Sequence, residues 1–169
     1  KVYYGTQPGS YGPGIDVNNV TSYQIDGLSN GTTYYVAVTA HDVSQNESGF
    51  SPEQNVSIPA PDTTPPTGSV VINSGGASTT SRTVSLTLSA SDAGGAVTGM
   101  RISNDGTTYS SEIAFAGSYA WTLPDSDGIK TVYVVFKDAA GNWMSSPAAD
   151  TIELRRDSDG DGMPDVWET

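Results

Sequence analysis

Short runs in which apolar and polar residues alternate recur along the chain. Such alternation indicates β-strands, because successive side chains of a strand point to opposite faces of a sheet. The clearest run spans residues 83–90, where every second residue is apolar, and a similar run spans residues 33–40. No long stretch shows helical periodicity. The pattern therefore predicts an all-β protein.

The second half of the chain holds most of these runs. About seven short strands between residues 68 and 154 fit an immunoglobulin-like β-sandwich. Asn104-Asp105-Gly106 is a hairpin turn signal within it. The residues expected to face its core are Val70, Ile72, Val84, Leu86, Leu88, Ala90, Tyr119, Trp121, Leu123, Val132, Val134, Phe136, Ile152 and Leu154.

The first half has fewer strand-like runs. Strands are expected at 1–4, 33–40 and 50–58, and the Gly- and Pro-rich residues 5–14 are expected to form a loop or a bent edge. Val2 and Tyr4 share one face of the first strand, and Tyr23 and Ile25 form a second inward-facing pair. Because Lys1 opens directly into a strand, we expect the chain to begin in the middle of a longer polypeptide.

Four prolines, Pro59, Pro61, Pro65 and Pro66, separate the two halves. Proline cannot donate a ladder hydrogen bond and favours extended backbone, so this stretch indicates a semi-rigid spacer. The expected organisation is a partial sandwich at 1–59, a linker at 60–67, a sandwich at 68–154 and a terminal loop at 155–169. The fold class is thus tandem immunoglobulin-like β-sandwiches, the first incomplete at its N-terminus, followed by a calcium-binding loop.

The terminal loop carries the most specific motif of the chain. Carboxylates fall at loop positions 1, 3, 5, 9 and 12, with Gly162 at position 6, which is the ligand spacing of a calcium loop. Without an ion these carboxylates would repel one another. The predicted Ca²⁺ ligands are Asp157, Asp159, Asp161, the backbone carbonyl of Met163, Asp165 and Glu168.

Two features distinguish this loop from a helix-loop-helix calcium site. The segment before it, residues 151–154, is strand-like, and Pro164 occupies position 8, where it suits the first turn of a short helix. The pattern resembles the thrombospondin type 3-like calcium repeats of secreted bacterial proteins. That resemblance covers about a dozen residues.

Residues 28–34, Leu-Ser-Asn-Gly-Thr-Thr-Tyr, resemble the corner before the sixth strand of a fibronectin type III module. The resemblance implies that the hydroxyl of Tyr34 bonds back to the chain. Residues 1–6 resemble the third strand of that module, so its first two strands are missing. We expect the face of Val2, Tyr4, Val36 and Val38 to be covered by an upstream segment or by a neighbouring subunit through strand addition.

Residues 100–106 and 128–142 resemble the immunoglobulin-like repeats of large bacterial surface and secreted proteins. The two halves also share an echo, because Asp42-x-x-x-Asn46 and Asp138-x-x-x-Asn142 each follow an alternating strand. Asp and Asn suit turns, so both motifs are interpreted as hairpin turns between the last two strands of their modules. A calcium role for either turn is the alternative.

Charge and composition exclude several classes of function. The net charge is −12 and the pI is about 4.1, which argue against nucleic acid and against anionic membrane surfaces as partners. No segment has the apolar length of a membrane-spanning helix. Cysteine is absent, so stability depends on packed cores and ions rather than disulfides.

No catalytic constellation emerges, and we expect the chain not to be an enzyme. His41 is the single histidine, with no cysteine or carboxylate cluster in the sequence around it that would make a zinc site. Asp125 and Asp127 place two carboxylates close together, as glycosidases do, but a turn is the simpler interpretation. Tyr3, Tyr11 and Tyr35 are candidates for a glycan-stacking platform.

The sequence thus favours an extracellular structural or adhesive module of a large surface or secreted bacterial protein, rigidified by calcium. One alternative is an accessory region, glycan-binding or spacing, of a secreted polysaccharide-degrading enzyme. Another is an extracellular filament subunit that completes its first sandwich with a strand of its neighbour.

Overall fold

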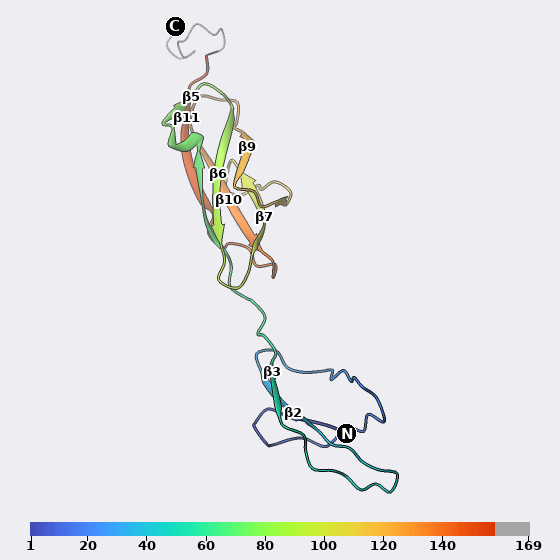
Figure 1. Ribbon diagram of the computed structural model, residues 1–169. Helices are drawn as coiled ribbons and strands as arrows, with labels where there is room; N and C mark the ends of the chain where they lie inside the picture. Colours follow the sequence, from blue (N-terminus) through green and yellow to red (C-terminus); the bar gives the residue numbers. More distant parts are fainter. Residues whose placement is uncertain (158–169) are drawn as a thin grey trace. The chain divides into compact units, whose positions relative to one another are not determined.

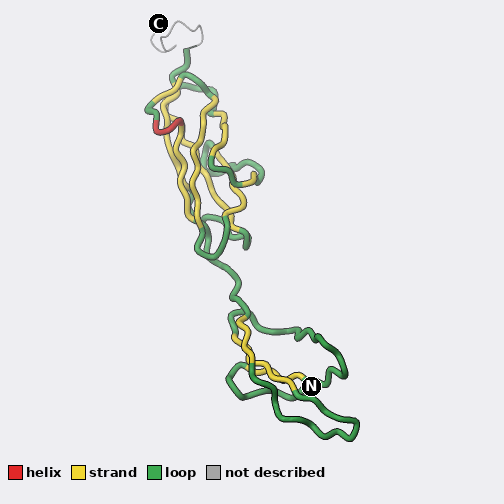
Figure 2. Tube along the Cα trace, in the orientation of Figure 1, coloured by secondary structure: helices red, strands yellow, loops and turns green. Residues whose placement is uncertain are grey.

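The computed structural model describes residues 1–157, and the prediction of an all-β fold is confirmed. Strands joined by loops and turns make up the described chain, with one short 3-10 turn, η1, at Asn73–Gly75 (Figures 1 and 2). The chain divides into two compact units, Lys1–Pro61 and Asp62–Thr169. No helix among residues 1–157 has the length and apolar character needed to span a lipid bilayer.

The second unit contains two sheets. One sheet has the strand order β4-β6-β9, and the other has the order β5-β11-β10-β7-β8. The strands of the first are β4 Thr67–Ile72, β6 Thr83–Ser91 and β9 Ser118–Thr122. Those of the second are β5 Ser78–Thr79, β7 Val97–Ser103, β8 Ile113–Ala114, β10 Gly128–Asp138 and β11 Ala148–Leu154.

The two sheets enclose one core, since the main cluster of buried side chains draws on both. The strict alternation of β6 is reflected in its burial, because Val84, Leu86 and Leu88 are buried while their neighbours are exposed. Phe136 of β10 is fully buried and meets Phe115 edge to face. The inward-facing residues expected in this unit are confirmed as buried, except that Ala90, Tyr119 and Trp121 are half-buried and pack against the core.

The Asn104–Gly106 turn forms, but it is not a tight hairpin. Gly106 adopts a left-handed φ of 73°, and the Asp105 carboxylate accepts hydrogen bonds from the backbone N–H groups of Thr107 and Thr108. These bonds, that of Thr108 above all, hold the pKa of Asp105 well below its ordinary value. The strands on either side pair only at Gly99–Ala114 and at the next residue pair, so the turn opens a longer loop between β7 and β8.

The first unit contains a single three-stranded antiparallel sheet, β1-β2-β3. Its strands are β1 Val2–Gly5, β2 Thr33–Val38 and β3 Gln54–Ser57, so the last strand is shorter than the expected 50–58. Val2 pairs with Val38 and Tyr4 with Val36, which puts these four side chains on one face. Within residues 1–61 only Tyr34 and Ala37 are buried hydrophobic residues, so this unit has little core of its own.

The outer edge of β1 is covered by the chain itself. Val2 and Ile15 exchange two backbone hydrogen bonds of 2.9 Å, and the N–H of Gly12 donates to the carbonyl of Tyr4. The Gly- and Pro-rich loop therefore folds back as a bent edge, one of the two forms expected for it.

Tyr23 and Ile25 belong to no strand, contrary to the expected inward pair. A strand requires a neighbour for its backbone groups. No described segment of the chain supplies that neighbour, so residues 16–26 lack regular structure.

Candidate functional site

The predicted calcium loop begins at the limit of the described residues. Asp157 is described, whereas Asp159, Asp161, Met163, Asp165 and Glu168 lie outside the described residues. What the structure does describe is the segment that delivers the chain to the loop, immediately after β11.

That segment is held against the sandwich by an arginine. The backbone N–H and the Nε of Arg156 both donate to Oδ1 of Asp127, at 3.1 and 2.9 Å. The Arg156 guanidinium also lies 3.3 Å from Asp125, whose other oxygen lies 3.4 Å from Arg82. These contacts tie the residue before Asp157 to the β9–β10 turn, so the loop starts from a restrained position.

The same contacts bear on whether Asp125 and Asp127 could act as a catalytic pair of carboxylates. Hydrogen bonds from Arg156 lower the pKa of Asp127. A glycosidase needs one carboxyl group with a raised pKa to act as an acid, and the pKa of Asp127 is shifted in the opposite direction. The interpretation of this segment as a structural turn is therefore supported.

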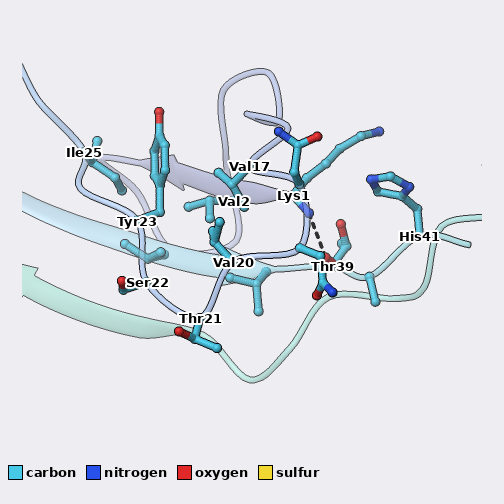
Figure 3. A pocket seen from close by; sticks show the side chains of 15 residues that line it. Lys1, Val2, Val17, Val20, Thr21, Ser22, Tyr23, Ile25, Thr39 and His41 are labelled. Carbon is cyan, nitrogen blue, oxygen red and sulfur yellow. Dashed lines mark hydrogen bonds between the residues drawn. The ribbon is translucent and has the colours of Figure 1, made fainter.

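The first unit has a groove on the face of β1 and β2 (Figure 3). It encloses about 920 Å³. Its floor includes Val2, Val36 and Val38 from the sheet, and its wall is the segment from Val17 to Ile25. The apolar face expected to need a partner is thus partly covered by the chain itself, yet Val38 is still 46% exposed.

Tyr34 confirms the corner that the sequence predicts in this unit. The backbone N–H of Ser29 donates a 2.9 Å hydrogen bond to the hydroxyl oxygen of Tyr34. The ring is 8% exposed and lies beside Tyr4, with ring centroids 6.0 Å apart. The corner therefore joins a loop to the few buried side chains of the first unit.

Tyr3 and Tyr11 lie together, but their partner is Phe50 rather than Tyr35. Phe50 meets both rings edge-on, with centroids 5.0 and 5.1 Å away. The hydroxyls of Tyr3 and Tyr11 donate to Glu47 and Glu53 respectively. Rings inclined at 52° to 89° offer no common flat surface, so the geometry does not favour a stacking platform for sugars.

His41 keeps its structural interpretation. Its Nε2 lies 3.4 Å from Asp16, and its backbone pairs with Glu47 beside the turn. Within residues 1–157 the one group of side chains able to hold a metal ion does not include it.

That group consists of Asp62, Asp92 and Asp138, which offer ligand oxygens within 4.8 Å of one another. Of these, the sequence singled out only Asp138, as part of a turn motif. The sequence does contain a signal for two strand ends. Asp92 lies two residues after the strand-like run 83–90, and Asp138 directly follows the run 128–137. What the sequence lacked was the pairing that brings these ends together.

The chain matches no protein-family model and no curated protein. Two solved structures are similar in fold. One is the PKD1 domain of Vibrio anguillarum Epp, with 16% identity over 57% of this chain and 100% of that chain, at a TM-score of 0.42. The other comprises fibronectin(III)-like modules of Clostridium thermocellum CbhA, with 18% identity over 92% of this chain and 77% of that chain, at a TM-score of 0.46.

Proposed function

We propose that this chain is a non-catalytic structural segment of a secreted or surface-exposed bacterial protein, and that its C-terminal loop binds calcium. The observation that carries the proposal is the restrained exit from the second unit, where Arg156 is bound to Asp127 and Asp125 directly before the first predicted ligand. When the residue before a calcium loop is held in place, calcium binding also fixes the direction in which the chain leaves the sandwich. A loop joined by a free hinge would not fix that direction.

The donor set fits a hard divalent cation, because every predicted ligand is an oxygen. The side chains of Asp157, Asp159, Asp161, Asp165 and Glu168, with the carbonyl of Met163, would hold the ion. When bound, the ion supplies the positive charge that lets these carboxylates share one turn. Asp127 and Asp125, through Arg156, orient the incoming chain. The role of the segment is then spacing or adhesion outside the cell, where calcium is abundant.

The test is a calcium titration of the 169-residue chain by calorimetry, with carboxypeptidase digestion as a second readout. Extracellular calcium modules bind at roughly 10⁻⁴ to 10⁻³ M. We expect binding in that range and protection of the last dozen residues. The triple variant Asp159→Asn, Asp161→Asn, Glu168→Gln is expected to lose the protection and the part of the binding heat that belongs to the loop. The control Asp26→Asn removes an exposed charge in the first unit and leaves both readouts unchanged. Identical titrations and digestion for the triple variant and the parent chain would refute the loop.

A second candidate function is supported by the groove of the first unit. Val38 in its apolar floor is 46% exposed, and residues 16–26 lie beside the floor without a strand partner among the described residues. A strand from an upstream segment or from a neighbouring subunit would pair with this segment and bury Val38 and Tyr23. Sedimentation velocity distinguishes the two sources, because only a neighbouring subunit gives concentration-dependent assembly that Val38→Asp abolishes.

A further inference from the structure

Three aspartates meet at one end of the second unit. Asp62 lies in the segment before β4, Asp92 follows the last residue of β6, and Asp138 is the last residue of β10. Thr67 of β4 pairs with Ser91 of β6, which brings the first two together. In the other sheet Asp138 pairs with Val97, near the end of the loop that follows Asp92. One oxygen from each carboxylate lies within 4.8 Å of the others.

No basic side chain balances this group. Among residues 1–157, none of the three aspartates forms an ion pair with lysine, arginine or histidine. Asp138 is 1% exposed. The site therefore concentrates negative charge where solvent screens it least.

One carboxylate oxygen at this site has nothing to bind. Oδ1 of Asp92 has less than 1 Å² of accessible surface and no hydrogen-bond partner, the sole such side-chain atom among the described residues. Oδ2 of the same carboxylate accepts a 2.7 Å hydrogen bond from the N–H of Gly94. A buried acceptor is normally satisfied, because leaving it unpaired costs its lost hydration. This oxygen is therefore available to bind a cation.

Gly94 and Asn142 allow Asp62 to lie beside the other two aspartates. A Cβ added at Gly94 would collide with the Asp62 carboxylate, so this position has room for that carboxylate because it is a glycine. The side-chain amide of Asn142 donates both to the backbone carbonyl of Asp62, at 3.1 Å, and to Oδ2 of Asp138, at 2.8 Å. The linker residue is therefore held to the sandwich by its backbone, with its carboxylate facing the other two.

We propose that Asp62, Asp92 and Asp138 form a second calcium site, at the end of the second unit where β10 finishes, opposite the end where β11 finishes. Calcium–oxygen distances of 2.3–2.6 Å allow two oxygens on one ion to be up to about 5 Å apart. The three carboxylates offer oxygens that lie within 4.8 Å of one another, inside that limit. Three carboxylates with no histidine or cysteine select a hard cation over zinc. Water completes the coordination, because Asp62 and Asp92 are only partly buried.

The ion at this site joins the segment before β4 to loops from both sheets. It gives the unpaired oxygen of Asp92 a partner and neutralises the repulsion among the three carboxylates. Its consequence is a stiffened connection at residues 62–66, where the prolines alone leave the chain only semi-rigid. This inference is independent of the C-terminal loop, since no residue is shared between them.

The experiment uses calorimetry on four forms of the 169-residue chain: the parent, the triple loop variant, Asp62→Asn, and the two combined. Asp62→Asn keeps an oxygen that can accept the hydrogen bond from the N–H of Thr64 and removes one charge. We expect calcium stoichiometries of two, one, one and zero. Binding to the triple loop variant tests this site alone, whereas binding to Asp62→Asn tests the loop alone.

Gly94→Ala provides a second variant that leaves every carboxylate in place. It is expected to weaken binding by the triple loop variant at least tenfold, because the added methyl group displaces Asp62. Asp42→Asn, in the related turn of the first unit, is the matched control and leaves the stoichiometry unchanged. Repeating the titration with magnesium is expected to give weaker binding, since magnesium requires a stricter geometry.

A thermal melt adds a signature that a purely structural role would not produce. With excess chelator, Asp62→Asn should melt at or above the parent temperature, because one repelling charge is gone. With calcium at about 10 mM, above the range of extracellular modules, the parent should have the higher melting temperature. The proposal is overturned if the triple loop variant binds no calcium, or if Asp62→Asn and Gly94→Ala leave its binding unchanged.

Discussion

The two units contain the same turn in different surroundings. In both, the Asn backbone N–H and side-chain amide donate to the two carboxylate oxygens of the Asp four residues earlier, at 2.9 and 2.8 Å for Asp42 and at 2.8 Å for both bonds of Asp138. In both, the third residue after the Asp has a left-handed φ, 65° at Gln45 and 98° at Gly141. The hydrogen bonding is therefore a property of the local sequence.

The surroundings separate the two turns. Asp42 is exposed and its neighbour is His41, whereas Asp138 is buried and faces Asp62 and Asp92. The difference follows from the sheets, because the second unit closes two sheets on a core and the first has one sheet with an open groove. The same turn motif therefore lies beside other carboxylates, and can contribute to the proposed cation site, only in the unit whose two sheets bring further strand ends to it.

The largest contrast between the units is expected from matched phenylalanine substitutions. Phe136→Ala empties a fully buried position of the second unit and should lower the free energy of unfolding by about 3–5 kcal/mol. Phe50→Ala removes a ring that is 56% exposed and should cost about 1 kcal/mol. Hydrogen exchange with mass spectrometry measures both, since the peptides of each unit report separately. Equal losses of unfolding free energy would contradict the conclusion that the first unit has little core of its own.

The next contrast concerns the twin turns. Asp138→Ala removes the acceptors of the backbone N–H and of one side-chain N–H of the half-buried Asn142, whereas in the exposed Asp42→Ala water replaces the lost carboxylate. We expect a clearly larger fall in melting temperature for Asp138→Ala, with the gap widening in millimolar calcium. Differential scanning calorimetry with and without chelator is the measurement. A difference in melting temperature that calcium does not change would contradict the role of Asp138 in the proposed calcium site.

A smaller effect is expected at the tyrosine corner of the first unit. Tyr34→Phe keeps the ring and removes the acceptor for the N–H of Ser29, so the first unit should lose about 1 kcal/mol of stability. Tyr35→Phe is the matched control on the same strand and should change little. Hydrogen exchange at Ser29 is the direct readout. No faster exchange there in Tyr34→Phe would contradict the role given to the corner.

The smallest effect is a pH dependence confined to the first unit. Hydrogen bonds from Lys1, and then from Thr39 and Tyr3, lower the pKa of Glu47 from 4.5 to about 2. A lowered carboxyl pKa adds stability above pH 4.5, and this stability is lost as the pH falls toward 2. Melting of the first unit, followed by its amide resonances, should therefore drop across that window. Glu47→Gln should reduce the pH dependence of the melting temperature between pH 4.5 and 2. An unchanged dependence would show that other carboxylates cause it.

Local patterns in the sequence determined the strands, the turns and the corner. The alternation at residues 83–90 predicts which side chains of β6 are buried, and the resemblance of residues 28–34 to a fibronectin type III corner implies that Tyr34 bonds back to the chain. These features succeed because they depend on neighbours a few residues apart, whose geometry the backbone sets directly. The spacing of the C-terminal carboxylates likewise predicts a calcium loop, and that remains a prediction.

Only the tertiary structure decided which distant residues share a site. Asp62, Asp92 and Asp138 are separated by 30 and 46 positions in the sequence and meet because two sheets align their ends. In the same way, Tyr23 and Ile25 alternate like a strand yet form none, since strand formation requires a backbone partner and no described segment provides it. Pairing between distant segments is a property of the whole sheet, so no local pattern contains it.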